Sequence, residues 1–166
     1  MQTRELLATL SRGNVEFIIV GGIAAIAHGS ARFTQDLDIS YRRTPDNLRK
    51  LAQTLAPMKP YLRGVPPGLP FKLDPQTLES GLNFTLTTTM GDLDLLGEIT
   101  GAGTYDEILP ESIEVEVMGE KVRIVSLDCL IRMKKAAGRI KDIDALAELQ
   151  KLAAEKTRLR EERHAT

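Results

Sequence analysis

The sequence predicts an α/β (α+β) domain in which a small mixed β-sheet is flanked by helices that pack mainly against one face. Three observations predict this class. Helical and strand-like segments alternate over the first 55 residues, strand-like segments dominate from about residue 82 to residue 125, and two helical segments follow. This order is typical of helices that pack on a sheet. The 166 residues suffice for one domain, 1–166, with 126–160 as its C-terminal helical part.

The first half of the chain is expected to alternate between helix and strand. Its expected elements are a helix at 3–12, a strand at 16–22, a short helix at 23–29, a strand at 36–40 and a helix from residue 45. Gly29 suits the position after a helix end. Thr44 is a good N-cap, and Pro45 suits the first helical position, which follows it.

The second half is expected to hold two pairs of strands and two helices. After a proline-rich surface excursion at 57–80, the expected elements are paired strands at 82–88 and 92–99, a hairpin at 113–117 and 121–125, a helix at 127–137 and a last helix from about residue 142. Ser126 is expected to cap the first of these helices, and Gly138 to end it. The mixed charge run at 155–166 is expected to be solvated or frayed.

Composition excludes several classes of protein. Lysine and arginine number 22 against 23 aspartates and glutamates, so the net charge of −1 gives the whole chain no attraction to nucleic acid or to an anionic membrane. Cys129 is the only cysteine, which excludes an intrachain disulfide and a cysteine-based zinc site. We expect this side chain to be buried and to act as a small hydrophobic residue. The longest apolar run, FIIVGGIAAIA, is too short to span a bilayer, and no signal-peptide pattern begins the chain. We expect a cytoplasmic protein.

Two aspartates in the stretch DLDIS suggest a metal site. Asp36 and Asp38 alternate with Leu37 and Ile39, so their side chains point to the same side of a strand, roughly 7 Å apart. Aspartate is disfavoured in strands, and neighbouring carboxylates raise each other's pKa unless a cation lies between them. Mg²⁺ prefers such oxygen ligands. A solvated strand face is the alternative interpretation.

A second acidic pair follows in the later strand GDLDLLGEI. Asp94 lies inside the strand between Leu93 and Leu95, whereas Asp92 directly follows Gly91. An aspartate inside a strand between two leucines is less expected than an aspartate beside a turn, and is therefore the stronger indication of a function. Asp94 is therefore the expected third ligand, with Asp92 as the substitute; Asp92 is otherwise an exposed turn residue.

The stretch VGGIAAIAHG suggests a place for a phosphate. A strand, the pair Gly21-Gly22 and a short helix bring backbone N–H groups and a helix N-terminus to one point. Neither the G-x-G-x-x-G spacing of a dinucleotide fold nor a G-x-x-x-x-G-K-[ST] loop is present. A plain tight turn is the alternative for both glycines.

Lysine and histidine give weaker signals. Lys134 falls in the middle of the apolar stripe of its helix, so it is either a cation aimed at a phosphate or a lysine whose stem covers core atoms. Arg139 and Lys141 either extend a basic rim or are surface charges. His28 has no recognisable Ser or Cys nucleophile as a partner, and a helix C-cap or a turn hydrogen bond is expected.

Together these residues resemble the DNA polymerase β-like nucleotidyltransferase superfamily. VGGIAAIAHGSARFTQDLDI resembles the bacterial nucleotidyltransferases related to AbiEii-type toxins, in which a G-[GS] turn, an HG, an Arg-x-Thr and a D-x-D occur in this order. SLDCLIRMKKAAGRIKDIDAL resembles their C-terminal helical part. The resemblance covers about Val15 to Leu149. It implies a nucleotidyltransferase fold, a minimal mixed sheet with flanking helices.

The resemblance also implies site residues and an activity. Asp36 and Asp38 would hold two Mg²⁺ ions, with Mn²⁺ as a substitute, and Asp94 would complete the site. The implied nucleotide contacts are Gly21, Gly22, Arg32, Thr34 and Lys134. The activity implied is transfer of a nucleoside monophosphate from a nucleoside triphosphate to a hydroxyl of a tRNA, a protein or a small molecule, with release of pyrophosphate. The alternatives are a non-catalytic nucleotide-binding module of a toxin–antitoxin or other two-protein system, with an antitoxin as partner, and a purely structural domain.

Overall fold

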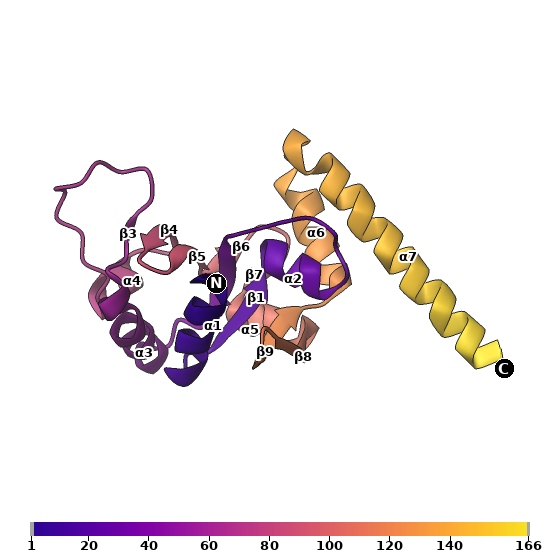
Figure 1. Ribbon diagram of the computed structural model, residues 1–166, viewed down its shortest axis with the longest axis horizontal. Helices are drawn as coiled ribbons and strands as arrows, with labels where there is room; N and C mark the ends of the chain where they lie inside the picture. Colours follow the sequence, from indigo (N-terminus) through magenta and orange to yellow (C-terminus); the bar gives the residue numbers. More distant parts are fainter. Residues whose placement is uncertain (1, 166) are drawn as a thin grey trace.

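The computed structural model describes residues 2–165, and its centre is a mixed β-sheet (Figure 1). Within these residues the sheet has seven strands in the order β3-β4-β5-β2-β1-β9-β8. The strands are β1 Phe17–Val20, β2 Leu37–Tyr41, β3 Tyr61–Leu62, β4 Asn83–Thr88, β5 Gly91–Leu96, β8 Ser112–Val117 and β9 Glu120–Val125, with β6 Glu98–Ile99 and β7 Gly103–Thr104 as a separate pair. β1 pairs in parallel with β9 and β2 with β5, whereas the other neighbours are antiparallel. The predicted fold class is confirmed.

Helix ends in the structure follow the local sequence signals. The helices are α1 Gln2–Arg12, α2 Gly21–Ala27, α3 Pro45–Leu55, α4 Pro75–Ser80, α5 Tyr105–Ile108, α6 Leu127–Ala137 and α7 Ile143–Ala165. The Thr44 side chain accepts a hydrogen bond from the Asn47 N–H at the start of α3. The Ser126 side chain accepts one from the Cys129 N–H at the start of α6, and Gly138 ends that helix with a φ of 62°. The predicted caps are therefore confirmed.

Residues 57–80 contain more structure than their prolines predict. Tyr61 and Leu62 form the edge strand β3, which pairs with β4. An edge strand tolerates a flanking proline such as Pro60, because its outer side needs no hydrogen bonds. α4 begins after Asp74, whose side chain caps the helix by accepting from the Thr77 N–H at 2.8 Å. Only the loop at 63–74 extends from the body as predicted (Figure 1).

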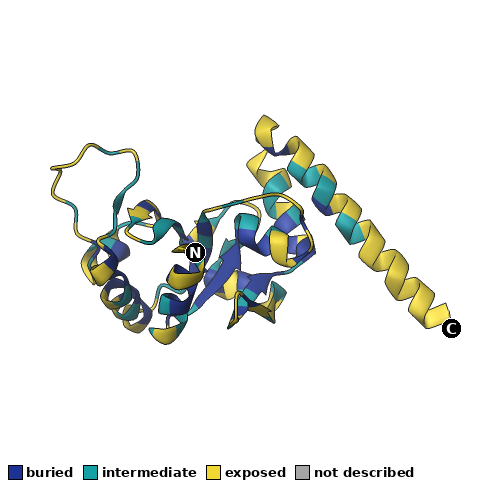
Figure 2. Ribbon diagram, viewed as in Figure 1, coloured by how far each residue is buried: buried dark blue, intermediate teal, exposed yellow. Residues whose placement is uncertain are grey.

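Two more segments differ from their predictions. The strand expected at 92–99 divides at Gly97, whose N–H donates to the Leu82 carbonyl, so that β5 ends there and β6 pairs with β7. The charge run at 155–165 is solvated as expected, but it is not frayed, since α7 continues through it. Good helix formers and the ion pair from Arg158 to Glu162, one turn apart, favour this extension. Figure 2 shows this part of α7 as exposed.

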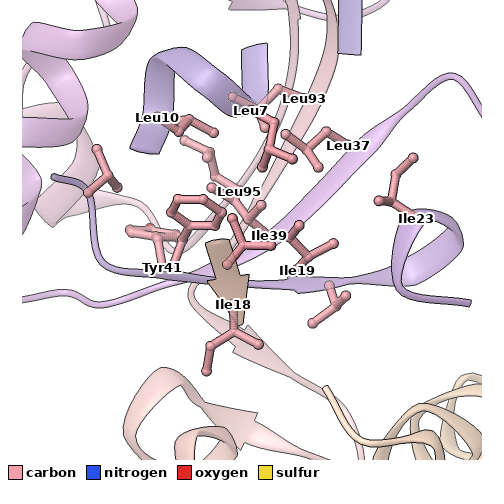
Figure 3. Packing of buried hydrophobic residues seen from close by; sticks show 14 of the residues in the cluster. Leu7, Leu10, Ile18, Ile19, Ile23, Leu37, Ile39, Tyr41, Leu93 and Leu95 are labelled. Atoms are coloured by element: carbon pink, nitrogen blue, oxygen red, sulfur yellow. The ribbon is translucent and has the colours of Figure 1, made fainter. Parts of the chain in front are cut away.

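The hydrophobic core lies between the sheet and α1. Alternating residues of β2 and β5 point to this side, where they meet leucines of α1 (Figure 3). β4 and β5 bury one face only, so the expected coverage of a single face holds for this part of the sheet alone. β1 is different, because all four of its residues are buried and Ile18 points away from Ile19 (Figure 3). Cys129 is fully buried, as predicted.

Asn47 is a buried polar residue that ties α3 to the sheet. Its Nδ2 donates to the carbonyls of Glu16 at 3.0 Å and Arg42 at 2.7 Å, and its Oδ1 accepts from the Glu16 N–H at 2.7 Å. We expect Asn47→Ala to lower the free energy of unfolding by about 2–4 kcal/mol, because buried backbone groups lose their partners. Urea unfolding measures this. Gln53→Ala, on the exposed side of the same helix, should change little; equal losses would contradict the assignment.

Candidate active site

The register of two parallel strands brings the predicted carboxylates together. β2 and β5 are neighbours, and Asp38 lies directly beside Asp94. The leucines that precede the two aspartates are fully buried in the core; because side chains alternate, both aspartates face the opposite side of the sheet. Asp36, just before β2, lines the same cleft of about 660 Å³. The structure thus places Asp36, Asp38 and Asp94 at one cleft.

Asp38 is crowded by negative charge. Burial raises its pKa to about 7, and the charge of Asp94, a hydrogen bond with Asp94 and the charge of Asp36 act in the same direction. Arg63 acts in the opposite direction. Near neutral pH the surroundings of Asp38 therefore hold too little positive charge for this carboxylate to ionise at its ordinary pKa.

Arg63 is a site residue that the sequence did not reveal. Its Nη2 donates to Asp94 Oδ1 at 2.8 Å, and its Nε lies 3.2 Å from Asp92 Oδ2. Asp94 lines the cleft, whereas Asp92 lies beside it and pairs with Arg63. The local pattern around Arg63 gives no functional signal, because only the pairing of β3 with β4 brings it near β5.

The donor set fits a divalent cation in its chemistry. Carboxylate oxygens are the ligands that Mg²⁺ prefers, and a cation would relieve the repulsion that raises the pKa of Asp38. The side chains are not gathered into a finished ligand set, however. Among residues 2–165, no three Asp, Glu, His or Cys side chains are arranged to hold a metal ion, and Asp94 pairs with Arg63 instead.

The two glycines make room for site side chains. The turn expected at Gly21-Gly22 is wrong, because α2 begins at Gly21, which has a φ of 68°. A Cβ atom on Gly21 would collide with the Asp38 carboxylate, and one on Gly22 would lie 2.9 Å from the Thr34 Cβ. Glycine at these positions therefore permits a close approach. Within residues 2–165 no side chain caps the first turn of α2, so N–H groups at the start of this helix face the cleft without a side-chain partner.

The remaining predicted contacts are divided between two adjoining hollows. Gly21, Gly22 and Lys134 line both the carboxylate cleft and a second pocket of about 250 Å³. Arg32 and Thr34 line only the second pocket. The structure thus brings Lys134 to the carboxylates and places the other two contacts on the far side of the glycines.

Lys134 belongs to a basic rim that is held by Asp142. Lys134 Nζ lies 3.2 Å from Asp142 Oδ1, and Arg139 Nε lies 2.6 Å from Asp142 Oδ2. Burial opposes ionisation of Asp142, but the hydrogen bonds from these two residues hold its pKa below the ordinary value. Arg139 and Lys141 both line the cleft. Asp142 was not predicted to have any role.

His28 anchors α7 and does not line either hollow. It caps the C-terminus of α2, as predicted. Its Nε2 lies 2.7 Å from the Val125 carbonyl and its Nδ1 lies 3.2 Å from Lys156 Nζ, so Nε2 donates and Nδ1 accepts. Burial lowers the pKa of His28, the Val125 hydrogen bond raises it and the charge of Lys156 lowers it further. The neutral His28 ring thus links Lys156 of α7 to the end of β9 and to the segment that leads from α2 to Asp36.

Comparisons with known proteins agree with this architecture. A crystal structure of a "putative nucleotidyltransferase" from Thermotoga maritima superposes with a TM-score of 0.56 over 90% of each chain, at 13% sequence identity. Residues 86–165, just under half of the chain, match the family described as "Nucleotidyl transferase of unknown function (DUF2204)". This match includes Asp94 and α6 but begins only after the D-x-D segment at 36–38.

Two further findings concern curated proteins and membrane helices. No curated protein matches the chain. None of the helices within residues 2–165 combines the length and the apolar character needed to cross a membrane. Neither match bears on the resemblance to AbiEii-related proteins, which stays a prediction. What the comparisons support is the general assignment: the protein has the mixed α/β fold of a nucleotidyltransferase and resembles that class of enzyme in sequence over residues 86–165.

Proposed function

We propose that the protein is a metal-dependent nucleotidyltransferase. It transfers a nucleoside monophosphate from a nucleoside triphosphate to a hydroxyl group, with release of pyrophosphate. The observation that carries this proposal is the parallel register of Asp38 and Asp94 in a cleft shared with Asp36 and bordered by Gly21 and Gly22. The fold and the family match support the same class of reaction.

The residues of the cleft have distinct roles in this proposal. Asp36 and Asp38 would hold two Mg²⁺ ions, with Mn²⁺ as a substitute, and Asp94 would complete the ligand set. Bound magnesium would neutralise charge on the attacking and leaving oxygens of an in-line displacement. The new bond joins the acceptor oxygen to the α-phosphorus, the bond from that phosphorus to the leaving pyrophosphate breaks, and the hydroxyl proton is released to solvent. The protein mainly positions the reactants.

The triphosphate lies beside the start of α2. The N–H groups of Gly21 and Gly22 donate to phosphate oxygens, and Lys134 adds positive charge from the cleft. Arg32 and Thr34 supply auxiliary contacts from the adjoining pocket. The acceptor hydroxyl belongs to a tRNA, a protein or a small molecule.

A labelling assay tests this function. The purified protein is incubated with Mg²⁺, a cell extract and each of the four α-³²P-labelled nucleoside triphosphates in turn. We expect label to move to RNA, protein or a small molecule, and the product class identifies the acceptor. EDTA and Asp94→Asn should abolish transfer, whereas Asp128→Asn, an exposed residue of α6, should not.

Two results would contradict catalysis. Transfer of label at an unchanged rate by Asp94→Asn would remove this residue from the site. Binding of Mg²⁺ and nucleotide without transfer from any of the four triphosphates would favour the non-catalytic module of a toxin–antitoxin or other two-protein system. Calorimetric titration with Mg²⁺ and a non-hydrolysable triphosphate distinguishes binding from the absence of binding.

A further inference from the structure

We infer that Arg63 is an internal counter-ion of the carboxylate cleft, which competes with a divalent cation for Asp94. This inference rests on the proposed function, because it concerns the same metal site. It assigns a function to the edge strand β3 and to the loop at 63–74 that follows it. Arg63 then tunes metal affinity without being a ligand itself.

The backbone of Arg63 is fixed at the edge of the sheet. Its N–H donates to the Thr85 carbonyl of β4 at 3.0 Å, which continues the pairing of β3 with β4. From this position the side chain reaches Asp94, the residue opposite Thr85 on β5. The guanidinium also donates to the Leu86 carbonyl at 2.7 Å. The pairing of β3 with β4 thus places the Arg63 guanidinium beside Asp94, the third predicted ligand.

The contacts of the Arg63 side chain are incomplete. The side chain is 28% exposed, so most of it is removed from water. Its Nε lies within ion-pair distance of Asp92 but lacks hydrogen-bond geometry, and among residues 2–165 this buried N–H has no hydrogen-bond partner. A buried donor without a partner destabilises the arrangement that contains it. Nη2 thus makes the hydrogen bonds of this side chain, whereas the contact of Nε with Asp92 rests on charge alone. The contacts with the two aspartates are ones that another cation can replace.

Charge balance gives the direction of the competition. Asp36, Asp38 and Asp94 line the cleft, and Asp92 lies beside it. Arg63 is the cation that pairs with Asp92 and Asp94. A divalent cation bound by these carboxylates would be repelled by the guanidinium and would draw on the same Asp94 carboxylate. Removing the guanidinium should therefore strengthen metal binding, although it removes an ion pair. An arginine that merely oriented Asp94 would have the opposite effect.

Metal titration of Arg63 variants tests this inference. Calorimetry in 150 mM KCl at pH 8 measures the Kd for Mg²⁺ and for Mn²⁺ without any nucleotide. We expect Arg63→Met to bind both ions about 5- to 50-fold more tightly than the parent protein, from the loss of one nearby positive charge in a partly screened site. Arg63→Lys keeps the charge and should stay close to the parent. Arg49→Met, which removes an exposed arginine of α3, is the matched control.

Hydrogen exchange supplies a second readout. The Arg63 N–H is protected by its bond to Thr85. If metal displaces the side chain, saturating Mg²⁺ should speed exchange at 63–74 in the parent protein and change it little in Arg63→Met. A uniform slowing at 63–74 would oppose the inference.

The outcomes separate the inference from the proposed function. Mg²⁺ binding that depends on Asp38 but is equal or weaker in Arg63→Met overturns the role of Arg63 and leaves the nucleotidyltransferase proposal intact. The absence of Mg²⁺ binding by the parent and by Arg63→Met overturns the role of Arg63, and the labelling assay then decides the proposed function separately, because Mg²⁺ can also enter with the triphosphate. Tighter binding by Arg49→Met as well would attribute the effect to net charge alone.

Discussion

Replacing Asp38 by asparagine is expected to abolish nucleotide transfer and also to make the protein more stable at pH 8 when EDTA is present. The loss of a metal ligand should lower the rate on the order of 1,000-fold, equivalent to several kcal/mol of transition-state stabilisation. The gain in stability has a separate cause. The substitution keeps a hydrogen-bonding side chain beside Asp94 while removing a charge that Asp94 and Asp36 repel.

The pH dependence follows from the raised pKa of Asp38. Its pKa is about 7 in the folded protein and about 3.9 in an unfolded chain, so the folded protein binds this proton more tightly. The stability that the protonated group contributes is fully present below about pH 4 and is lost as pH rises through about 7. The parent protein should therefore lose stability across this range, and Asp38→Asn should lose less.

Thermal unfolding with EDTA at pH 5 and pH 8 measures this difference. We expect Asp38→Asn to be more stable than the parent at pH 8 by about 1–3 kcal/mol, less than the full pKa shift implies because the site is partly open to solvent. Asp128→Asn, which removes an exposed carboxylate, should show no such gain. A lower melting temperature for Asp38→Asn at pH 8, or transfer at the parent rate, would contradict the assigned role.

Gly21→Ala is expected to destabilise the protein and to weaken metal binding together. Alanine at a φ of 68° is strained by about 1 kcal/mol, and its Cβ would also collide with the Asp38 carboxylate. We expect a total loss of about 2–4 kcal/mol in the free energy of unfolding. Displacement of Asp38 should raise the Kd for Mg²⁺ by about tenfold or more.

Gly138→Ala is the matched control for this change. Gly138 has a nearly identical φ of 62°, but a Cβ there meets nothing closer than the Lys135 carbonyl at 4.0 Å. It should therefore show the backbone strain alone, with unchanged Mg²⁺ affinity. Urea unfolding and calorimetry of both variants separate strain from collision. Equal effects at the two glycines would show that the close approach of Asp38 has no importance.

Much of the candidate site could be predicted because strand geometry is local. Alternation along DLDIS predicts that Asp36 and Asp38 share a side, and the same alternation distinguishes Asp94 from its leucine neighbours. Arg63 could not be predicted in this way. It lies in a proline-rich segment whose short strand forms only because β4 offers an edge, and no periodic pattern marks a two-residue strand.

The sequence by itself determined the fold class, the helix caps at Thr44, Ser126 and Gly138, and the side of each strand on which the aspartates lie. The caps and the facing of the aspartates depend on interactions within a few residues, and the fold class follows from the order of helical and strand-like segments along the chain. Only the tertiary structure decided that Asp94 lies beside Asp38 and that Arg63 reaches both acidic residues of β5. The register between strands more than fifty residues apart depends on how the whole core packs. Sliding one strand by a single residue would turn the Asp94 side chain to the face of the sheet that the core leucines occupy.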